Sequence, residues 1–426
     1  MSKNTKLLES VSKYFTEETL REIVANAYGV EKNTENIKVS SWDFGHASKR
    51  GDSYLSTVDR IAIRSKVNGA AKELKVVVKS LPNNIGRRKT YRSADFFRNE
   101  IVFYSEIAPK FQEFLKSKEQ SSLLLLPSCL AFHLDGDNDF IVLEDMCPRG
   151  FGPAARQNCL TFDECTCILE AMARFHGVSF AYRDQHREDF ERIASRLTET
   201  YFTEHLYETW YERFFIKVTD IAKDALAKEY PDSEAQRRFG SYGVAELYKK
   251  CVDFCSRTTS PTSVVNQGDS WAPNFLTRTC NPEGYMEVLM LDFQLARCCS
   301  PVLDVSFLVY SCTDQKLRDA RFDDLLRNYH RELARAIEAL GSDPGKIYPW
   351  ESFAREVDEQ FVHGMVFGLE SVTFSTLSDE ESFDLDIIKE DRVDIADVWT
   401  VKNKETAESR RRLADIIVHA TDRGFL

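Results

Sequence analysis

Two kinds of hydrophobic periodicity divide the chain. Between residues 41 and 147, apolar residues form short runs such as Arg60–Ile63, Lys75–Ser80 and Phe140–Leu143, which predict strands. From Thr161 onward, apolar positions recur at helical spacing. The pattern therefore predicts a helical segment over residues 1–40, a strand-containing segment after it, and a change to long helices with a boundary near residue 150.

A lysine interrupts one of the predicted strands. In the run KVVVKS, Val76 and Val78 share one face, and Val77 and Lys79 share the other. A lysine on an apolar strand face needs a partner, because a buried charge without one is costly. Glu100, on the helix predicted after residues 82–95, is the partner we expect. A solvated edge lysine beside a surface glutamate is the structural alternative.

The stretch from Ser263 to Asp304 carries the chemistry. A strand leads into Gly268-Asp269, Asn274 follows, and a hairpin predicted to turn at residues 281–284 ends at Asp292. Each residue alone is a common turn or cap residue. Together and in this order they are what phosphoryl transfer needs: Asp269 to orient the attacking hydroxyl, and Asn274 with Asp292 to hold Mg²⁺.

The motifs in this stretch resemble those of the ecdysteroid kinase-like family. They are Gly268-Asp269-Ser270-Trp271 with Asn274, then Leu291-Asp292-Phe293-Gln294, then Ser300-Pro301 with Asp304. That family is similar in turn to aminoglycoside and choline kinases, which are variants of the protein-kinase fold. One position departs from the pattern, because Gln267 stands where the family usually has a histidine that supports the catalytic loop.

The resemblance implies a two-lobed α+β kinase-like fold, with an antiparallel sheet in a small lobe over residues 41–147 and a mainly helical large lobe over residues 148–426. It also implies an ATP- and Mg²⁺-dependent phosphotransferase with an alcohol group as acceptor. It makes Asp269 the catalytic base and Asp304 a brace for the catalytic loop. The nucleotide-binding residues it implies are a phosphate-covering loop, a phosphate-binding ion pair and a hinge: Gly45, Gly51 and Ser53; Lys79 and Glu100; and Glu144 and Met146 within residues 144–147.

Composition and net charge limit the kinds of ligand and the compartment that we expect for this protein. The net charge of −12 argues against nucleic acid as the main ligand, because phosphate-backbone binding needs a basic surface. The N-terminal residues lack the apolar core of a secretory signal, and the longest apolar block, Leu123–Leu126, is too short to span a membrane. Eleven cysteines without a CxxC pair fit reduced thiols, so we expect a cytoplasmic enzyme, with a monomer as the simplest state.

The sequence defines the phosphoryl acceptor less sharply than the residues of the predicted catalytic loop. His176 has no acidic or cysteine neighbour at helical spacing, so we expect a packed core histidine. An aromatic cluster between residues 201 and 215 is by default core, but by the resemblance it also helps to shape the acceptor pocket. We expect a lipophilic alcohol, most simply an ecdysteroid or a similar steroid or xenobiotic. A choline-, ethanolamine- or aminoglycoside-type kinase and a pseudokinase remain alternatives.

Overall fold

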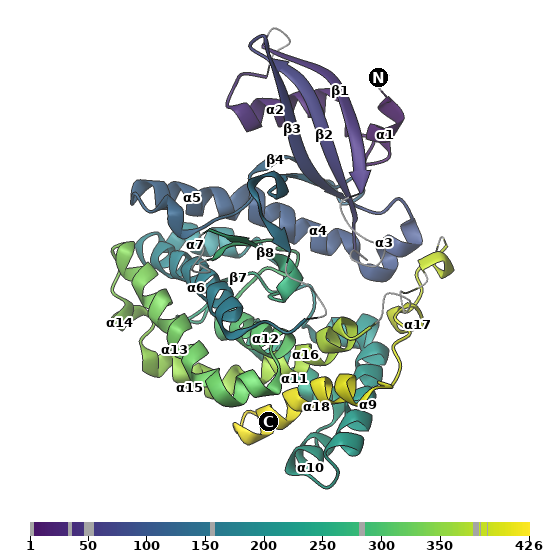
Figure 1. Cartoon of the computed structure of the whole chain (residues 1–426), viewed down its shortest axis with the longest axis vertical. Coiled ribbons are helices and arrows are strands. Elements are labelled where there is room, and N and C mark those ends of the chain that lie inside the picture. Colours follow the sequence, from purple (N-terminus) through teal and green to yellow (C-terminus); the bar gives the residue numbers. More distant parts are fainter. Residues whose placement is uncertain are drawn as a thin grey trace. The chain divides into compact units, whose positions relative to one another are not determined.

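The computed structural model describes residues 4–32, 36–46, 55–153, 158–280, 286–377, 383, 385–389 and 391–426. The chain divides into two compact units (Figure 1). The small lobe comprises Met1–Ser105, Leu126–Gly152 and Ser382–Asp394, and the large lobe comprises Glu106–Leu125, Pro153–Glu381 and Ile395–Leu426.

The small lobe contains a five-stranded sheet with the strand order β1-β2-β3-β5-β4, and every neighbouring pair is antiparallel. This confirms the antiparallel sheet predicted from the sequence. The strands are β1 (Ile37–His46), β2 (Thr57–Val67), β3 (Ala70–Ser80), β4 (Cys129–His133) and β5 (Phe140–Glu144). The helices are α1 (Thr5–Glu9), α2 (Glu17–Tyr28), α3 (Ile85–Tyr91) and α4 (Ser93–Val102), with short turns η3 (Cys147–Arg149) and η7 (Leu385–Ile387).

Alternation along β3 separates two faces of this sheet. Val76 and Val78 are buried in a core that includes Ile61 and Ile63 of β2 and Phe15 before α2. Lys79 lies on the opposite face, as the sequence predicted. The N-terminal helices therefore cover the apolar face of the sheet, and the face that carries Lys79 is left for polar chemistry.

The N-terminal segment is helical over a shorter range than expected. Helix α2 begins after Thr16, whose hydroxyl accepts from the backbone N–H of Thr19 in a capping box. Strand β1 already begins at Ile37, three residues before the predicted end of the helical segment. Ile37 and Val39 are both buried, so the period-two burial of a strand determines the structure here.

The large lobe is mainly helical. Its principal helices are α5 (Ala108–Ser117), α6 (Phe162–Gln185), α7 (Arg187–Ala194), α8 (Glu204–Leu206), α9 (Glu212–Glu229), α10 (Glu234–Ser241), α11 (Val244–Ser256), α12 (Val302–Cys312), α13 (Gln315–Ala339), α14 (Pro344–Ile347), α15 (Trp350–Gln360), α16 (Val362–Ser375), α17 (Ile395–Val398) and α18 (Ala407–Asp422). Shorter turns are the π-helix η4 (Tyr207–Tyr211) and the 3₁₀ turns η2 (Ser121–Leu123) and η5 (Ala272–Asn274). The π-helix η1 (Phe103–Ile107) spans the chain boundary between the small lobe and the large lobe after Ser105.

Short strands lie within this helical lobe. They are β7 (Val264–Asn266), β8 (Phe275–Thr279), β9 (Met286–Met290) and β10 (Arg297–Cys299), and β6 (Gly152–Pro153) begins at the lobe boundary. Strands β8 and β9 pair antiparallel, which confirms the predicted hairpin. The predicted turn of that hairpin falls on residues outside the described ranges.

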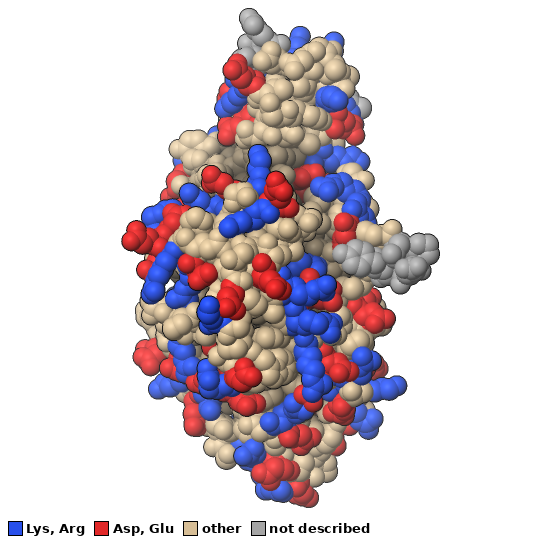
Figure 2. Space-filling view, turned by 90° about the vertical axis from the view of Figure 1, so that its left-hand side faces the viewer, with Lys and Arg blue, Asp and Glu red and all other residues tan. Residues whose placement is uncertain are grey.

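Three general properties bear on function. Lysines and arginines lie intermingled with aspartates and glutamates on the face drawn in Figure 2. All eleven cysteines are free thiols. No helix among the described residues is long and apolar enough to cross a membrane.

Helices α12 and α16 approach closely at a glycine. A Cβ atom at Gly364 would lie 2.2 Å from the backbone carbon and oxygen of Ser306. At Gly368, one turn later, the nearest atom is the flexible end of Ile416, at 3.2 Å. The crossing therefore requires glycine at residue 364 but not at residue 368.

We predict that Gly364→Ala lowers the free energy of unfolding by about 2 kcal/mol or more, because the two helix backbones must separate. Gly368→Ala is the matched control and should change stability by about 1 kcal/mol at most, since alanine also favours the helix. Urea denaturation measures both. Equal stability of the Gly364→Ala variant and the wild type would contradict the crossing geometry.

Candidate active site

A buried strand and a tight turn place Asp269. Strand β7 pairs antiparallel with β10, and the chain then turns through Gly268 at a φ of +86°. A Cβ at residue 268 would lie 1.9 Å from the carbonyl oxygen of Leu295, so no other residue fits this close approach. Asp269 follows at once, with part of its side chain open to solvent.

Asp304 and His176 form a buried hydrogen-bond network that supports this turn. The two carboxylate oxygens of Asp304, in the first turn of α12, accept the backbone N–H groups of Gln267 and Gly268 at 2.8 and 2.9 Å. His176 lies 3.2 Å from the same carboxylate and 2.8 Å from the hydroxyl of Tyr329. Asp304 therefore makes the hydrogen bonds that the expected bracing role requires. His176 is fully buried, as predicted for a core histidine.

Gln267 connects the catalytic loop to the segment that carries Asp292. Its Nε2 donates to the carbonyl oxygens of Leu291 and Asp292, both at 2.9 Å. Its Oε1 accepts from the backbone N–H of Asp269 at 2.9 Å and from the hydroxyl of Ser270 at 3.0 Å. All four bonds require this one orientation of the amide. Gln267 therefore supports both segments in the place of the usual histidine.

Asp269, Asn274 and Asp292 converge in the large lobe. Asn274 Nδ2 donates to the backbone oxygen and to Oδ2 of Asp269, each at 2.9 Å. The Asn274 carbonyl accepts from the backbone N–H of Leu291 at 2.9 Å, which ties the hairpin end to the loop. Asp292 follows in the left-handed region at a φ of 58°. The structure thus brings together the three large-lobe residues that the sequence singled out.

The electrostatics of this group fit a cation. Burial raises the pKa of Asp269 to about 7, with a further contribution from the negative charge of Asp292. Two carboxylates and an amide are the hard oxygen donors that Mg²⁺ prefers, and a cation offsets their repulsion. The described residues contain no cluster of three or more His, Cys, Asp or Glu suited to a metal. Among the donors present, Asp292 and Asn274 are the candidate metal ligands.

In the small lobe, Lys79 and Glu100 form the predicted pair. Lys79 Nζ lies 2.8 and 3.1 Å from the two carboxylate oxygens of Glu100. The Glu100 side chain is fully buried and that of Lys79 is 13% exposed. The pairing satisfies a buried carboxylate and holds the ammonium group on its face of the sheet.

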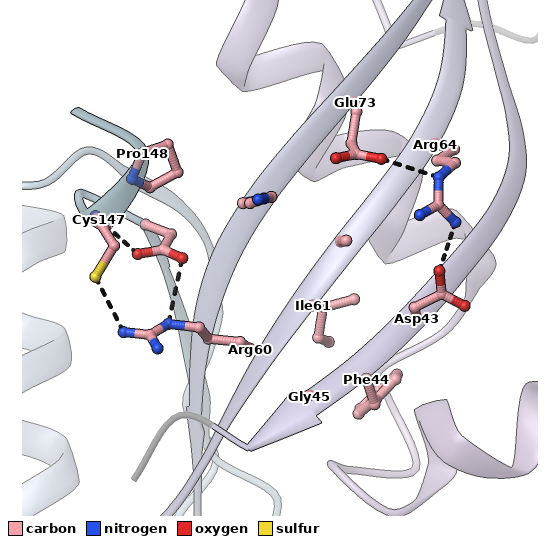
Figure 3. A pocket seen from close by; sticks show the side chains of 12 residues that line it. Asp43, Phe44, Gly45, Arg60, Ile61, Arg64, Glu73, Cys147 and Pro148 are labelled. Atoms are coloured by element: carbon pink, nitrogen blue, oxygen red, sulfur yellow. Dashed lines mark hydrogen bonds and ion pairs between the residues drawn. The ribbon is translucent and has the colours of Figure 1, made fainter. Parts of the chain in front are cut away.

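A pocket of about 600 Å³ lies on the same face of the sheet (Figure 3). The strand register places Arg60 of β2 opposite Val77, which shares this face with Lys79. Arg60 Nε lies 3.2 Å from Asp145 Oδ2, and Arg60 Nη2 donates to Cys147 Sγ. Gly45 also lines the pocket. The sequence did not single out Arg60, and it marked Asp145 only as part of the predicted hinge at residues 144–147, although both charges stand beside apolar strand residues.

The predicted hinge follows β5. Glu144 ends the strand, and the backbone N–H of Asp145 donates to Lys75 at 3.2 Å. The backbone N–H of Met146 has no hydrogen-bond partner among the described residues, and its carbonyl accepts from Arg149 and Phe151. A nucleobase could accept from this amide. Gly51 and Ser53, predicted for the phosphate-covering loop, lie outside the described residues.

A second buried carboxylate in the large lobe was missed. Glu370 of α16 is 8% exposed, and its Oε2 accepts hydroxyl hydrogen bonds from Tyr201, at 2.5 Å, and from Tyr211. Burial raises the pKa of Glu370 to about 7. The sequence held a signal, because Glu370 is the one charged residue, leaving histidine aside, in the mainly apolar run Val362–Ser375.

We predict that Gln267→Leu lowers kcat for Mg-ATP turnover by about 10²-fold, while KM for ATP changes little, because it loosens the positions of Asp269 and Asp292 together. Gln267→His should restore part of the loss. Gln185→Leu is the control: Gln185 also makes two amide hydrogen bonds, to Leu340 and Ser342, but far along the sequence from the loop. Full activity of Gln267→Leu would exclude the positioning role.

We predict that Glu370→Gln stabilises the protein more at pH 8 than at pH 5, by up to about 3 kcal/mol. The ordinary pKa is 4.5 and the folded pKa is about 7, so within that window the folded protein keeps a proton that the unfolded chain releases. Wild-type stability therefore falls as the pH rises through this window, and glutamine removes the loss. Denaturant titrations at both pH values measure it, and a pH-independent effect would refute the assignment.

Comparisons with known proteins agree with this geometry. The model of the ecdysteroid kinase-like family matches residues 50–342, which is more than half of the chain. No curated protein matches the chain in sequence.

Three solved structures have a low overall similarity. A microcompartment-associated aminopropanol kinase is 11% identical, with a TM-score of 0.41 and coverage of 96% of this chain and 98% of that one. The GDP complex of an aminoglycoside 2'-phosphotransferase mutant is 15% identical, with a TM-score of 0.34 and coverages of 78% and 92%. A putative fructosamine-3-kinase from Haemophilus somnus is 10% identical, with a TM-score of 0.35 and coverages of 97% and 100%. Scores this low add nothing to the assignment, which rests on the family match: the chain belongs to the ecdysteroid kinase-like family of small-molecule kinases.

Proposed function

We propose that the protein transfers the γ-phosphoryl group of ATP to a hydroxyl group of a lipophilic small molecule, such as an ecdysteroid or a similar steroid or xenobiotic alcohol. The observation that carries this proposal is the network in which Gln267 and Asp304 hold the catalytic loop and the Asp292 segment together. In-line phosphoryl transfer depends on positioning and charge neutralisation, and this network fixes the groups that supply both.

Asp269 acts on the acceptor. Its carboxylate orients the acceptor hydroxyl and takes its proton as the new oxygen–phosphorus bond forms. Its pKa of about 7 suits a group that accepts a proton near neutral pH. Asn274 fixes the carboxylate through two hydrogen bonds, so the reacting oxygen of Asp269 keeps one direction.

Other groups of the chain hold the nucleotide. Asn274 and Asp292 are the proposed Mg²⁺ ligands, and the metal when bound neutralises charge on the phosphates. Lys79, held by Glu100, contacts the α- and β-phosphates. The N–H of Met146, which has no hydrogen-bond partner among the described residues, meets the adenine edge, and Gly45 approaches the phosphates. Free thiols at all cysteines favour the reducing cytoplasm as the site of action.

A pseudokinase is less well supported. Gln267 was the residue that kept this reading open, because it replaces a histidine that usually supports the loop. It makes four hydrogen bonds, and Asp269, Asn274 and Asp292 keep the positions that phosphoryl transfer needs. Magnesium-dependent ATP binding without any acceptor-dependent release of ADP would favour the pseudokinase.

We predict that Asp269→Asn lowers kcat by about 10² to 10⁴-fold, because the hydroxyl loses its base, while ATP binding persists. The measurement is mass spectrometry of acceptors incubated with Mg-ATP, from a panel of ecdysone, other sterols, choline, ethanolamine and an aminoglycoside. We expect the gain of one phosphate on an acceptor with wild type only.

Asp324→Asn is the control, since Asp324 is an exposed residue of α13 and should leave turnover unchanged. Undiminished phosphorylation by Asp269→Asn would contradict the catalytic role. Phosphorylation of choline or the aminoglycoside alone would correct the acceptor class but keep the reaction.

A further inference from the structure

Glu370 is a buried carboxylate without a cation. Its hydrogen bonds both go to Oε2, and the described residues give Oε1 neither a hydrogen bond nor an ion pair. Other buried glutamates are better satisfied: Glu100 pairs with Lys79, and Glu356 accepts hydroxyl hydrogen bonds on both oxygens. A buried charge normally has a partner. Oε1 of Glu370 is therefore available to accept a hydrogen bond or an ion pair from a ligand.

Aromatic rings pack around Tyr201, one of the two hydroxyl partners of this carboxylate. The Tyr201 ring centroid lies 5.3 Å from that of Trp210, 4.9 Å from that of Tyr211 and 5.1 Å from that of Phe367. Aromatic faces attract cations, and a carboxylate among them strengthens the attraction. A neutral hydroxyl could donate to Oε1 but would leave the negative charge uncompensated.

The carboxylate belongs to the same part of the large lobe as the catalytic loop. The end of α12 contacts both: Cys312 Sγ accepts from the backbone N–H of Ala272 at 3.1 Å, and Ser311 hydrogen-bonds to Ser371 at 2.7 Å. Ser371 is the neighbour of Glu370 on α16. The charge of Glu370 also contributes to the raised pKa of Asp269.

We propose that Glu370, with the rings of Tyr201, Trp210 and Tyr211, binds a cationic nitrogen of the acceptor. The acceptor is then a hydroxyl-bearing hydrophobic amine or quaternary ammonium compound, with its nitrogen at Glu370 and its hydroxyl at Asp269. This rests on the proposed function for the role of Asp269, and it keeps the lipophilic acceptor but adds a positive charge. A plain steroid lacks that charge.

Calorimetry of ligand binding without nucleotide tests this inference. The probes are benzyldimethyl(hydroxyethyl)ammonium and its neutral isostere, in which carbon replaces nitrogen. We expect the wild type to bind the cation about tenfold or more tightly than the isostere at pH 8. Glu370→Gln should abolish the preference, and Glu356→Gln, an equally buried glutamate, should keep it.

Two further measurements separate charge from structural damage. Tyr211→Phe removes one hydrogen bond but keeps the Glu370 charge, so the preference should survive. For the wild type, the preference should grow from pH 6 to pH 8 as Glu370 ionises. The titratable groups hydrogen-bonded to it are Tyr201 and Tyr211, whose pKa values burial raises well above the ordinary value, and the charge of Glu370 also raises the pKa of Asp269. Asp269 titrates in the same range, so the Glu370→Gln variant at both pH values isolates the contribution of Glu370.

Equal binding of cation and isostere, no binding of either, or an unchanged preference in Glu370→Gln would overturn the inference. Its failure is distinguishable from failure of the proposed function. If a neutral sterol is phosphorylated in an Asp269-dependent manner while the cation does not bind, the kinase stands and this inference falls. If the cation binds through Glu370 but no acceptor is phosphorylated, the binding site stands and the kinase falls.

Discussion

The large lobe depends on satisfying buried polar groups at the end of one short strand. Two backbone N–H groups, those of Gln267 and Gly268, point at the single carboxylate of Asp304. A buried amide without an acceptor costs about 1–3 kcal/mol, so this carboxylate determines where the chain turns. The turn then determines the direction of Asp269, and the Gln267 amide extends the same constraint to Asp292. The proposed catalytic arrangement of Asp269 and Asp292 therefore follows from the need to satisfy these buried hydrogen-bonding groups.

The negative charges of Glu100 and Glu370, the two buried glutamates in our proposals, are stabilised in different ways. Glu100 is fully buried but has Lys79 as its partner, and the pair holds the ammonium in place. Glu370 has two phenols and no cation, so its burial raises its pKa instead. The first arrangement is complete in the protein itself. The second has no cation among the described residues, and our proposal that the acceptor carries a positive charge rests on this difference.

Much of the fold followed from periodicity, because the signals were local. The strand KVVVKS, the hairpin before Asp292 and the Lys79–Glu100 pair each follow from short-range alternation or from the cost of an unpaired charge. The consequences of Gln267 could not be predicted in this way. Its four partners lie up to 25 residues away in sequence, and only the folded chain determines which carbonyls its amide meets.

The hydrogen-bond partners of Glu370 could not be predicted from the sequence either. Its tyrosine partners are 169 and 159 residues away. They lie in an aromatic segment that is by default core and that the family resemblance connected with the acceptor pocket, without naming a partner for any residue. A single acidic residue in an apolar helix was a usable signal, but it names no partner. The start of β1 was misjudged for a different reason, since the few residues after α2 carry too weak a period to separate helix from strand.

The central claim is that Asp292, and not Asp269, holds the metal that the nucleotide shares. Calorimetric titration of ADP with and without Mg²⁺ tests it directly on the wild type, Asp269→Asn and Asp292→Asn. We expect Mg²⁺ to tighten ADP binding by about tenfold or more in the wild type and in Asp269→Asn, and to have no effect in Asp292→Asn. If Mg²⁺ tightened ADP binding equally in Asp292→Asn, the assignment of the site would be wrong.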